Sequence, residues 1–106
     1  MNFRETITPD AALDLARAVD WYDSQEPGVG EKFYLAFREK LEQILESPLS
    51  PRPHGRRKIR KVNLYKFPYG IYYEVVEHQV RVLAVIHGAR DPKYVGYRLR
   101  GAALKL

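Results

Sequence analysis

The beginning of the chain changes from strand-like to helix-like patterning. Residues 3–8 alternate with a period of two, which predicts a short first strand. A helix is expected next, because the Thr8 side chain can accept a hydrogen bond from a free amide and Pro9 suits the first helical position. Apolar residues recur at helical spacing over residues 12–22, so we expect this helix to run to about Ser24.

A second helix follows after a turn. Residues 27–30 read Pro-Gly-Val-Gly, and apolar residues at helical spacing continue from Phe33 to Leu45, until Ser47-Pro48 ends the pattern. The two glycines lack a third and follow a helix instead of a strand, which favours a turn over a phosphate-binding loop. Two amphipathic helices joined by so short a link should pack as a hairpin.

The second half of the chain has strand patterning. Residues 48–57 contain three prolines and one glycine and are expected to form a loop. Strands are predicted over residues 59–65, 69–76 and 79–87, and residues 93–106 are expected to form one helical turn or a disordered arm. The order β-α-α-β-β-β predicts an α+β fold in which a small, antiparallel-rich sheet packs against an N-terminal helical hairpin.

The composition indicates one globular domain, spanning residues 1–106. Hydrophobic residues make up 45% and charged residues 29% of the chain, which excludes a low-complexity or disordered class. There is no cysteine, so disulfides, thiolate metal sites and cysteine nucleophiles are excluded. The longest apolar run, residues 82–86, is far shorter than the about 20 residues of a membrane span, and no export signal opens the chain. We therefore expect a cytoplasmic protein that does not associate with a membrane.

The net charge of +5 hides two halves of opposite sign. Residues 1–50 hold five Lys and Arg against ten Asp and Glu, a net charge of −5, whereas residues 51–106 hold thirteen against three, a net charge of +10. Residues 51–66 alone contain seven cations and no acid, and five aromatic residues lie within residues 65–73. This segregation predicts that the second half binds an acidic peptide or a polyanion.

Other candidate chemistry is weaker. The three histidines have none of the close spacings of a metal site, and none of the three serines lies on a nucleophile elbow, so we expect no metal and no cofactor. Tyr22, and Trp21 beside it, are expected to pack in the core. The helical carboxylates are expected to form solvated faces, some paired with nearby cations: Asp14, Asp20, Asp23, Glu39, Glu42 and Glu46.

Several segments, in order along nearly the whole chain, resemble the RelE/ParE superfamily, the toxins of bacterial type II toxin–antitoxin modules, often labelled plasmid stabilisation proteins. The segments that carry this resemblance are Asp20-Trp21-Tyr22, Gly28 to Phe33, Ser47-Pro48, Arg60, Phe67-Pro68-Tyr69, Tyr73, and Leu83 to Tyr94. The fold that the resemblance implies, a small antiparallel sheet backed by a helical hairpin, agrees with the element order read from periodicity.

Two branches of the superfamily imply different activities. RelE-like toxins cut mRNA on the ribosome, and on that reading Arg90, Lys61 and Tyr94 are the catalytic candidates, with Tyr97 an alternative to Tyr94. His87 is a further candidate as general base, whereas the family pattern has it as a framework residue. Here the sequence has Gly70, where RelE-like nucleases tend to carry another arginine, so one stabiliser of phosphate charge is missing.

ParE-like toxins are described as poisons of DNA gyrase, and the patterns at residues 67–69 and 87–94 are closer to that branch. We therefore expect a gyrase-inhibiting toxin, with the endoribonuclease as the alternative and a non-toxic binding module as the second. The resemblance implies an acidic, partly disordered antitoxin and a toxin–antitoxin hetero-oligomer. The expected partner-binding residues are Arg56, Arg57, Lys58, Arg60, Lys66, Tyr69, Arg98 and Arg100.

Overall fold

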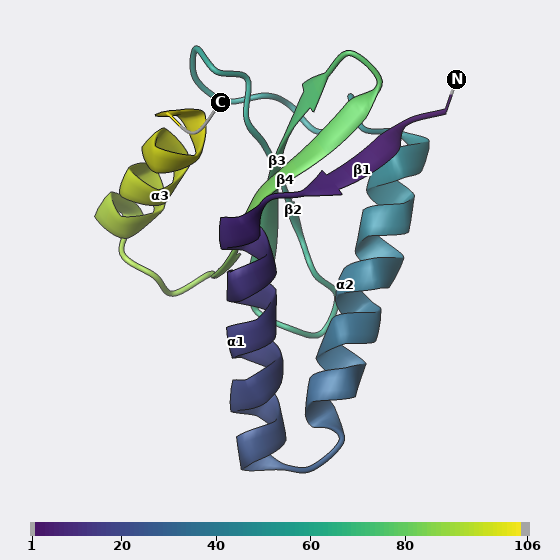
Figure 1. The fold of residues 1–106 in the computed structure, drawn as a ribbon, viewed down its shortest axis with the longest axis vertical. Helices are drawn as coiled ribbons and strands as arrows, with labels where there is room; N and C mark the ends of the chain where they lie inside the picture. The colour runs from purple at the N-terminus through teal and green to yellow at the C-terminus, as the bar shows by residue number, and fades with distance from the viewer. Residues whose placement is uncertain (1, 105–106) are drawn as a thin grey trace.

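A computed structural model describes residues 2–104, with the side chains of residues 102–104 left out. Its elements follow the order β-α-α-β-β-β-α (Figure 1). They are β1 (Arg4–Ile7), α1 (Pro9–Gln25), α2 (Val29–Glu46), β2 (Arg60–Asn63), β3 (Tyr69–Val76), β4 (Gln79–His87) and α3 (Pro92–Leu104). The predicted α+β class is confirmed, and the bounds of β3 and β4 are those that the apolar pattern predicts.

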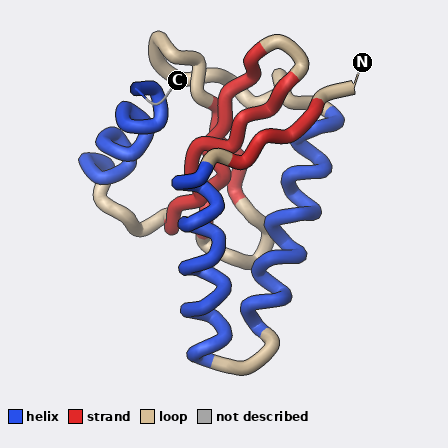
Figure 2. The backbone as a smooth tube through the Cα atoms, viewed as in Figure 1, coloured by secondary structure: helices blue, strands red, loops and turns tan. Residues whose placement is uncertain are grey.

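The four strands form one sheet in the order β1-β4-β3-β2. The pairs β2–β3 and β3–β4 are antiparallel, whereas β1 lies parallel to β4, so the sheet is mixed. Figure 2 shows its strands in red beside the helices in blue. The first helix begins as expected, because Thr8 accepts from the Ala11 amide at 3.3 Å and its hydroxyl donates to the Val82 carbonyl at 2.9 Å. The cap therefore also ties α1 to β4.

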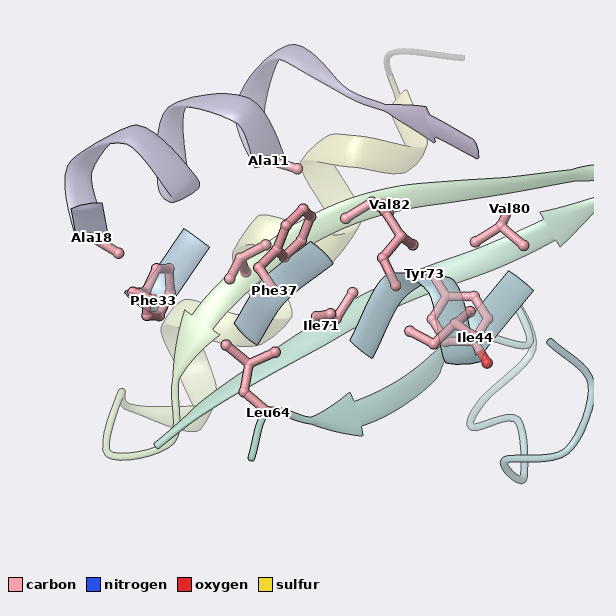
Figure 3. Close-up of a cluster of buried hydrophobic side chains, with 12 residues drawn as sticks. Ala11, Ala18, Phe33, Phe37, Ile44, Leu64, Ile71, Tyr73, Val80 and Val82 are labelled. Atoms are coloured by element: carbon pink, nitrogen blue, oxygen red, sulfur yellow. The ribbon is translucent and has the colours of Figure 1, made fainter. Parts of the chain in front are cut away.

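The main core lies between the sheet and the α1–α2 hairpin. Phe33, Phe37 and Leu41 of α2 are fully buried against Ile71 and Tyr73 of β3 (Figure 3). Aromatic rings extend the core, and Tyr22 stacks on Phe33 with the centroids 5.3 Å apart. The prediction that Tyr22 packs in the core is therefore confirmed. The same prediction is wrong for Trp21, which is 55% exposed.

The C-terminal segment corrects the sequence prediction. Residues 92–104 form a 13-residue helix, not a single turn or a disordered arm, and residues 105–106 lie outside the described part of the chain. Asp91 caps its beginning by accepting from the Lys93 amide at 2.8 Å. Leu99 of α3 packs against a small second cluster formed by Ile59 and Leu83, with Tyr72 beside it. In Figure 1, α3 lies at the left of the sheet and α2 at its right.

The turn between α1 and α2 is confirmed at Gly28 and Gly30. Gly28 has a φ of 94°, a left-handed conformation that favours glycine. The Asp23 carboxylate accepts from the Gly28 amide at 3.2 Å and from the Gly30 amide at 2.8 Å, so these amides already have an anionic partner. A Cβ on Gly30 would lie 2.5 Å from the Val19 carbonyl oxygen, which means that the close contact between the two helices requires glycine.

Replacing Gly30 by alanine should therefore destabilise the hairpin. We expect Gly30→Ala to lower the free energy of unfolding by about 2 kcal/mol, because the new methyl group overlaps a backbone oxygen. The control is Gly101→Ala in α3, where a Cβ meets nothing within 4 Å. That change should stabilise the protein by about 0.5 kcal/mol through helix propensity. Urea unfolding measures both, and equal effects would contradict the steric account.

Candidate functional site

A carboxylate of α1 joins three elements. Asp14 accepts from Arg98 of α3 through both guanidinium nitrogens Nη1 and Nη2, each at 2.7 Å, and from the Val85 amide of β4 at 3.0 Å. The Asp14 and Arg98 side chains are only 11% and 13% exposed. The expectation of a solvated carboxylate is wrong at Asp14. One feature of the sequence is consistent with the burial of Asp14: it lies on the same helical face as Ala11 and Ala18, which are buried.

The same arginine orders a tyrosine. Arg98 Nη1 donates to the Tyr94 hydroxyl at 2.9 Å, one helical turn away. Hydrogen bonding to Asp14 raises the pKa of Arg98 above its usual value, so this guanidinium stays charged. Arg98 was expected to bind a partner, but in the structure its donors are directed to Asp14 and Tyr94. These bonds link α3 to α1, and Asp14 in turn accepts from β4.

Arg90 and His87 lie next to this cluster. The Arg90 guanidinium carbon is 3.6 Å from the centre of the Tyr94 ring, which is a cation–π contact. His87 Nδ1 accepts from the Ala89 amide at 2.9 Å, and the imidazole meets the Tyr69 ring edge-on at 5.0 Å. Because Nδ1 is the acceptor, the hydrogen of the neutral ring is on Nε2.

These side chains line a pocket of about 250 Å³ at the end of β4, between α1 and α3. Arg90, His87 and Tyr94, three of the four nuclease candidates, lie in its wall, with Arg17 and Trp21 contributed by α1. Sequence reasoning missed Arg17, because nothing close to it in the chain suggests a site. Arg17 could be recognised only from the position of α1, which places this side chain at the end of β4.

The fourth nuclease candidate lies elsewhere. Lys61, in β2, has its ammonium 5.5 Å from the centre of the Tyr72 ring and is absent from the pocket wall. A Cβ on Gly70 would lie 2.6 Å from Lys61 Cε. Gly70 therefore makes room for the Lys61 side chain on the face of the sheet that bears Tyr72. The structure does not bring Lys61 together with the other three candidates.

The expected partner-binding residues fall into two groups. Arg57 donates to the Leu99 carbonyl at 2.8 Å and Arg60 to the Pro51 carbonyl at 2.9 Å, so both hold the loop in place. Tyr69 is partly buried and packs on the core. The exposed members of the set are Arg56, Lys58, Lys66 and Arg100. Within residues 2–104 no three His, Asp or Glu side chains lie close enough to hold a metal ion, and no helix is long and apolar enough to cross a membrane.

Comparison with known proteins identifies the family. The sequence profile of the family described as "ParE toxin of type II toxin-antitoxin system, parDE" matches residues 6–92. The chain belongs to the ParE toxin family. Membership in this family implies an antitoxin as the partner of this toxin. A search of curated protein sequences found no match.

Solved structures share the fold of this ParE-family toxin. A chain of the chromosomal ParDE toxin–antitoxin system from P. aeruginosa is 19% identical with a TM-score of 0.72, over 80% of this chain and 95% of that one. A mutant of the E. coli toxin RelE in the free state is 20% identical with a TM-score of 0.60, over 95% and 98%. The isolated E. coli RelE toxin is 22% identical with a TM-score of 0.52, over 92% and 97%.

The Asp14 contacts predict a large energetic effect for one carboxylate. Asp14→Asn leaves the Arg98 guanidinium nearly buried without a counter-charge, so the free energy of unfolding should fall by about 3 kcal/mol. The control is Glu5→Gln, which breaks the more exposed Glu5–Arg38 pair, in which the side chains are 30% and 28% exposed. That change should cost less than about 1 kcal/mol. Urea unfolding compares them, and a smaller loss for Asp14→Asn than for Glu5→Gln would refute this assignment.

Proposed function

We propose that this ParE-family toxin inhibits DNA gyrase by binding it, without a catalytic step of its own. The observation that carries the proposal is the separation of Lys61 from the pocket that holds Arg90, His87 and Tyr94. Phosphodiester cleavage without a metal depends on preorganised donors around one phosphate. Gly70 supplies no cation in the middle strand, and Lys61 lies over the sheet instead. Inhibition by binding requires no such constellation.

We also propose that the cognate antitoxin is acidic, partly disordered when free, and forms a hetero-oligomer with the toxin in the cytoplasm. The support is charge complementarity on two exposed regions. Arg56 and Lys58 are exposed in the loop of residues 47–59, here called the basic loop, and Arg100 is exposed on α3. A groove of about 640 Å³ between α2 and residues 65–67 has an apolar wall that includes Leu35. Three ammonium groups, those of Lys32, Lys40 and Lys66, and one carboxylate, that of Glu39, also line it, so its charge is positive. An amphipathic acidic segment complements such a surface.

A ribosome-dependent endoribonuclease is the second candidate. It is favoured by the grouping of Arg90, His87 and Tyr94 in one pocket. There Arg90 would stabilise charge on the phosphate, while His87 or Tyr94 would exchange a proton with the ribose. If Lys61 also takes part, binding to the ribosome or the mRNA would have to move its ammonium group close to the phosphate in the pocket.

A supercoiling assay tests the first proposal. Purified DNA gyrase should lose supercoiling activity when this toxin is added, and the cognate antitoxin should restore it. Arg90→Ala and Lys61→Ala should leave gyrase inhibition within about threefold of the wild type, if neither residue acts as a catalyst. Full supercoiling at a large molar excess of folded toxin would contradict gyrase as the target.

The alternatives give different results in the same set of experiments. Site-specific mRNA cleavage in a translating extract that falls by about a hundredfold in Arg90→Ala and Lys61→Ala would establish the endoribonuclease instead. A non-toxic binding module predicts unchanged growth when the intact chain is expressed without its antitoxin. Each of the three functions thus has an outcome that the other two do not share.

A further inference from the structure

The pocket at the end of β4 has an unbalanced positive charge. Asp14 is the one carboxylate in its wall, and both oxygens of Asp14 are occupied by Arg98 and the Val85 amide. Arg17 and Arg90 also line the wall, and neither makes an ion pair with any carboxylate described in residues 2–104. After Arg98 is neutralised by Asp14, two guanidinium charges remain without an ion-pair partner among the described residues.

The other polar groups of the pocket are hydrogen-bond donors. The Tyr94 oxygen accepts from Arg98, which leaves the phenolic hydrogen free to donate. His87 accepts from the Ala89 amide through Nδ1, so its Nε2–H is the remaining polar group of the neutral ring. Arg90 lies against the Tyr94 ring, with its guanidinium carbon 3.6 Å from the ring centre, and its guanidinium carries further N–H donors. The donors come from α1, from α3 and from the end of β4 with the loop after it, so they approach a bound group from different sides.

We propose that this pocket binds a phosphate monoester dianion, the group that a mononucleotide or the 5′ end of a nucleic-acid strand carries. Two unpaired guanidiniums match a charge near −2, and donors from several directions suit three terminal oxygens better than the two oxygens of a planar carboxylate. The cavity of about 250 Å³ is just below the usual range for small-molecule sites, and the nearly buried Asp14–Arg98 pair forms part of its wall.

One aromatic side chain supports a nucleotide over a free phosphate ion. Trp21 lies in the wall of the pocket and is 55% exposed, so part of its indole ring is accessible to a ligand. A base attached to the bound phosphate can stack on an exposed aromatic ring, which adds binding free energy without base selectivity. We therefore expect adenosine 5′-monophosphate to bind more tightly than inorganic phosphate.

Calorimetric titration of the purified full chain, at constant ionic strength, tests this site with three probes: inorganic phosphate, adenosine 5′-monophosphate and adenosine. The monophosphate should bind with one-to-one stoichiometry, and at least about tenfold more tightly than adenosine, because the unphosphorylated nucleoside cannot use the guanidiniums. Equal binding of the monophosphate and adenosine, or no saturable binding of either phosphate probe, would overturn the proposal. None of these titrations involves gyrase, so the result is independent of the proposed target.

Substitutions locate the site. Arg17→Gln and Arg90→Gln should each weaken binding of adenosine 5′-monophosphate about tenfold. Both side chains are exposed and unpaired within the described chain, so the variants should fold, and circular dichroism checks this. Arg4→Gln removes one exposed cation from β1, outside the pocket wall, and should change binding less than about twofold. An equal loss in Arg4→Gln would show general attraction to a basic protein and would refute a built site.

A last comparison separates the two sources of the phosphate group. Short single-stranded DNA with a 5′-phosphate should bind more tightly than the same strand with a 5′-hydroxyl if strand ends are the ligand. If the mononucleotide binds and the 5′-phosphate adds nothing to the strand, a free nucleotide is the source. If both strands bind alike and the mononucleotide does not bind, the ligand is the phosphodiester backbone, and the monoester site is wrong.

Discussion

The Asp14 carboxylate, in the first half of the chain, accepts hydrogen bonds from two elements of the second half, and the placement of α3 depends on it. One oxygen binds Arg98 of α3, and the other binds Arg98 as well as the Val85 amide of β4. A nearly buried ion pair adds little net stability, because its attraction is offset by the desolvation of two charges. What it adds is a specific position, since α3 has few other contacts and Asp14 satisfies donors on two elements at once. The Asp14–Arg98 ion pair thus joins the negatively charged first half of the chain to the positively charged second half.

The position of α3 in turn supports both functional regions. Tyr94, one turn before Arg98, forms a wall of the pocket and carries the stacked Arg90. On the other side of the helix, the Leu99 carbonyl accepts from Arg57 and so anchors the basic loop. A surface that binds partners by charge must present its cations in a fixed arrangement to be selective. In this toxin α3 contributes to that arrangement, and it is held by the Asp14–Arg98 pair and by the packing of Leu99.

The sequence predicts most of the fold because periodicity is a local signal. The bounds of β3 and β4 and the helical hairpin follow from patterns within one element, and residues 87–94 group in space because they are close in the chain. The helix α3 was missed, since its apolar positions are few and its docking relies on Leu99 and on a pair 84 residues apart in sequence. The positions of Asp14 and Arg17 could not be predicted for the same reason, because both depend on contacts between α1 and residues far away in the sequence, at the end of β4.

Hydrogen exchange of the α3 amides tests most directly whether Asp14 holds this helix. In the wild-type toxin, amides of residues 96–101 should exchange slowly, and in Asp14→Asn they should exchange at least about tenfold faster, because opening of α3 alone becomes easier. Amides of residues 33–44 in α2 should keep their relative protection, since the buried residues of α2 pack in the main core and make no hydrogen bond to Asp14 or Arg98. Unchanged protection of α3 in a folded Asp14→Asn protein would contradict this account.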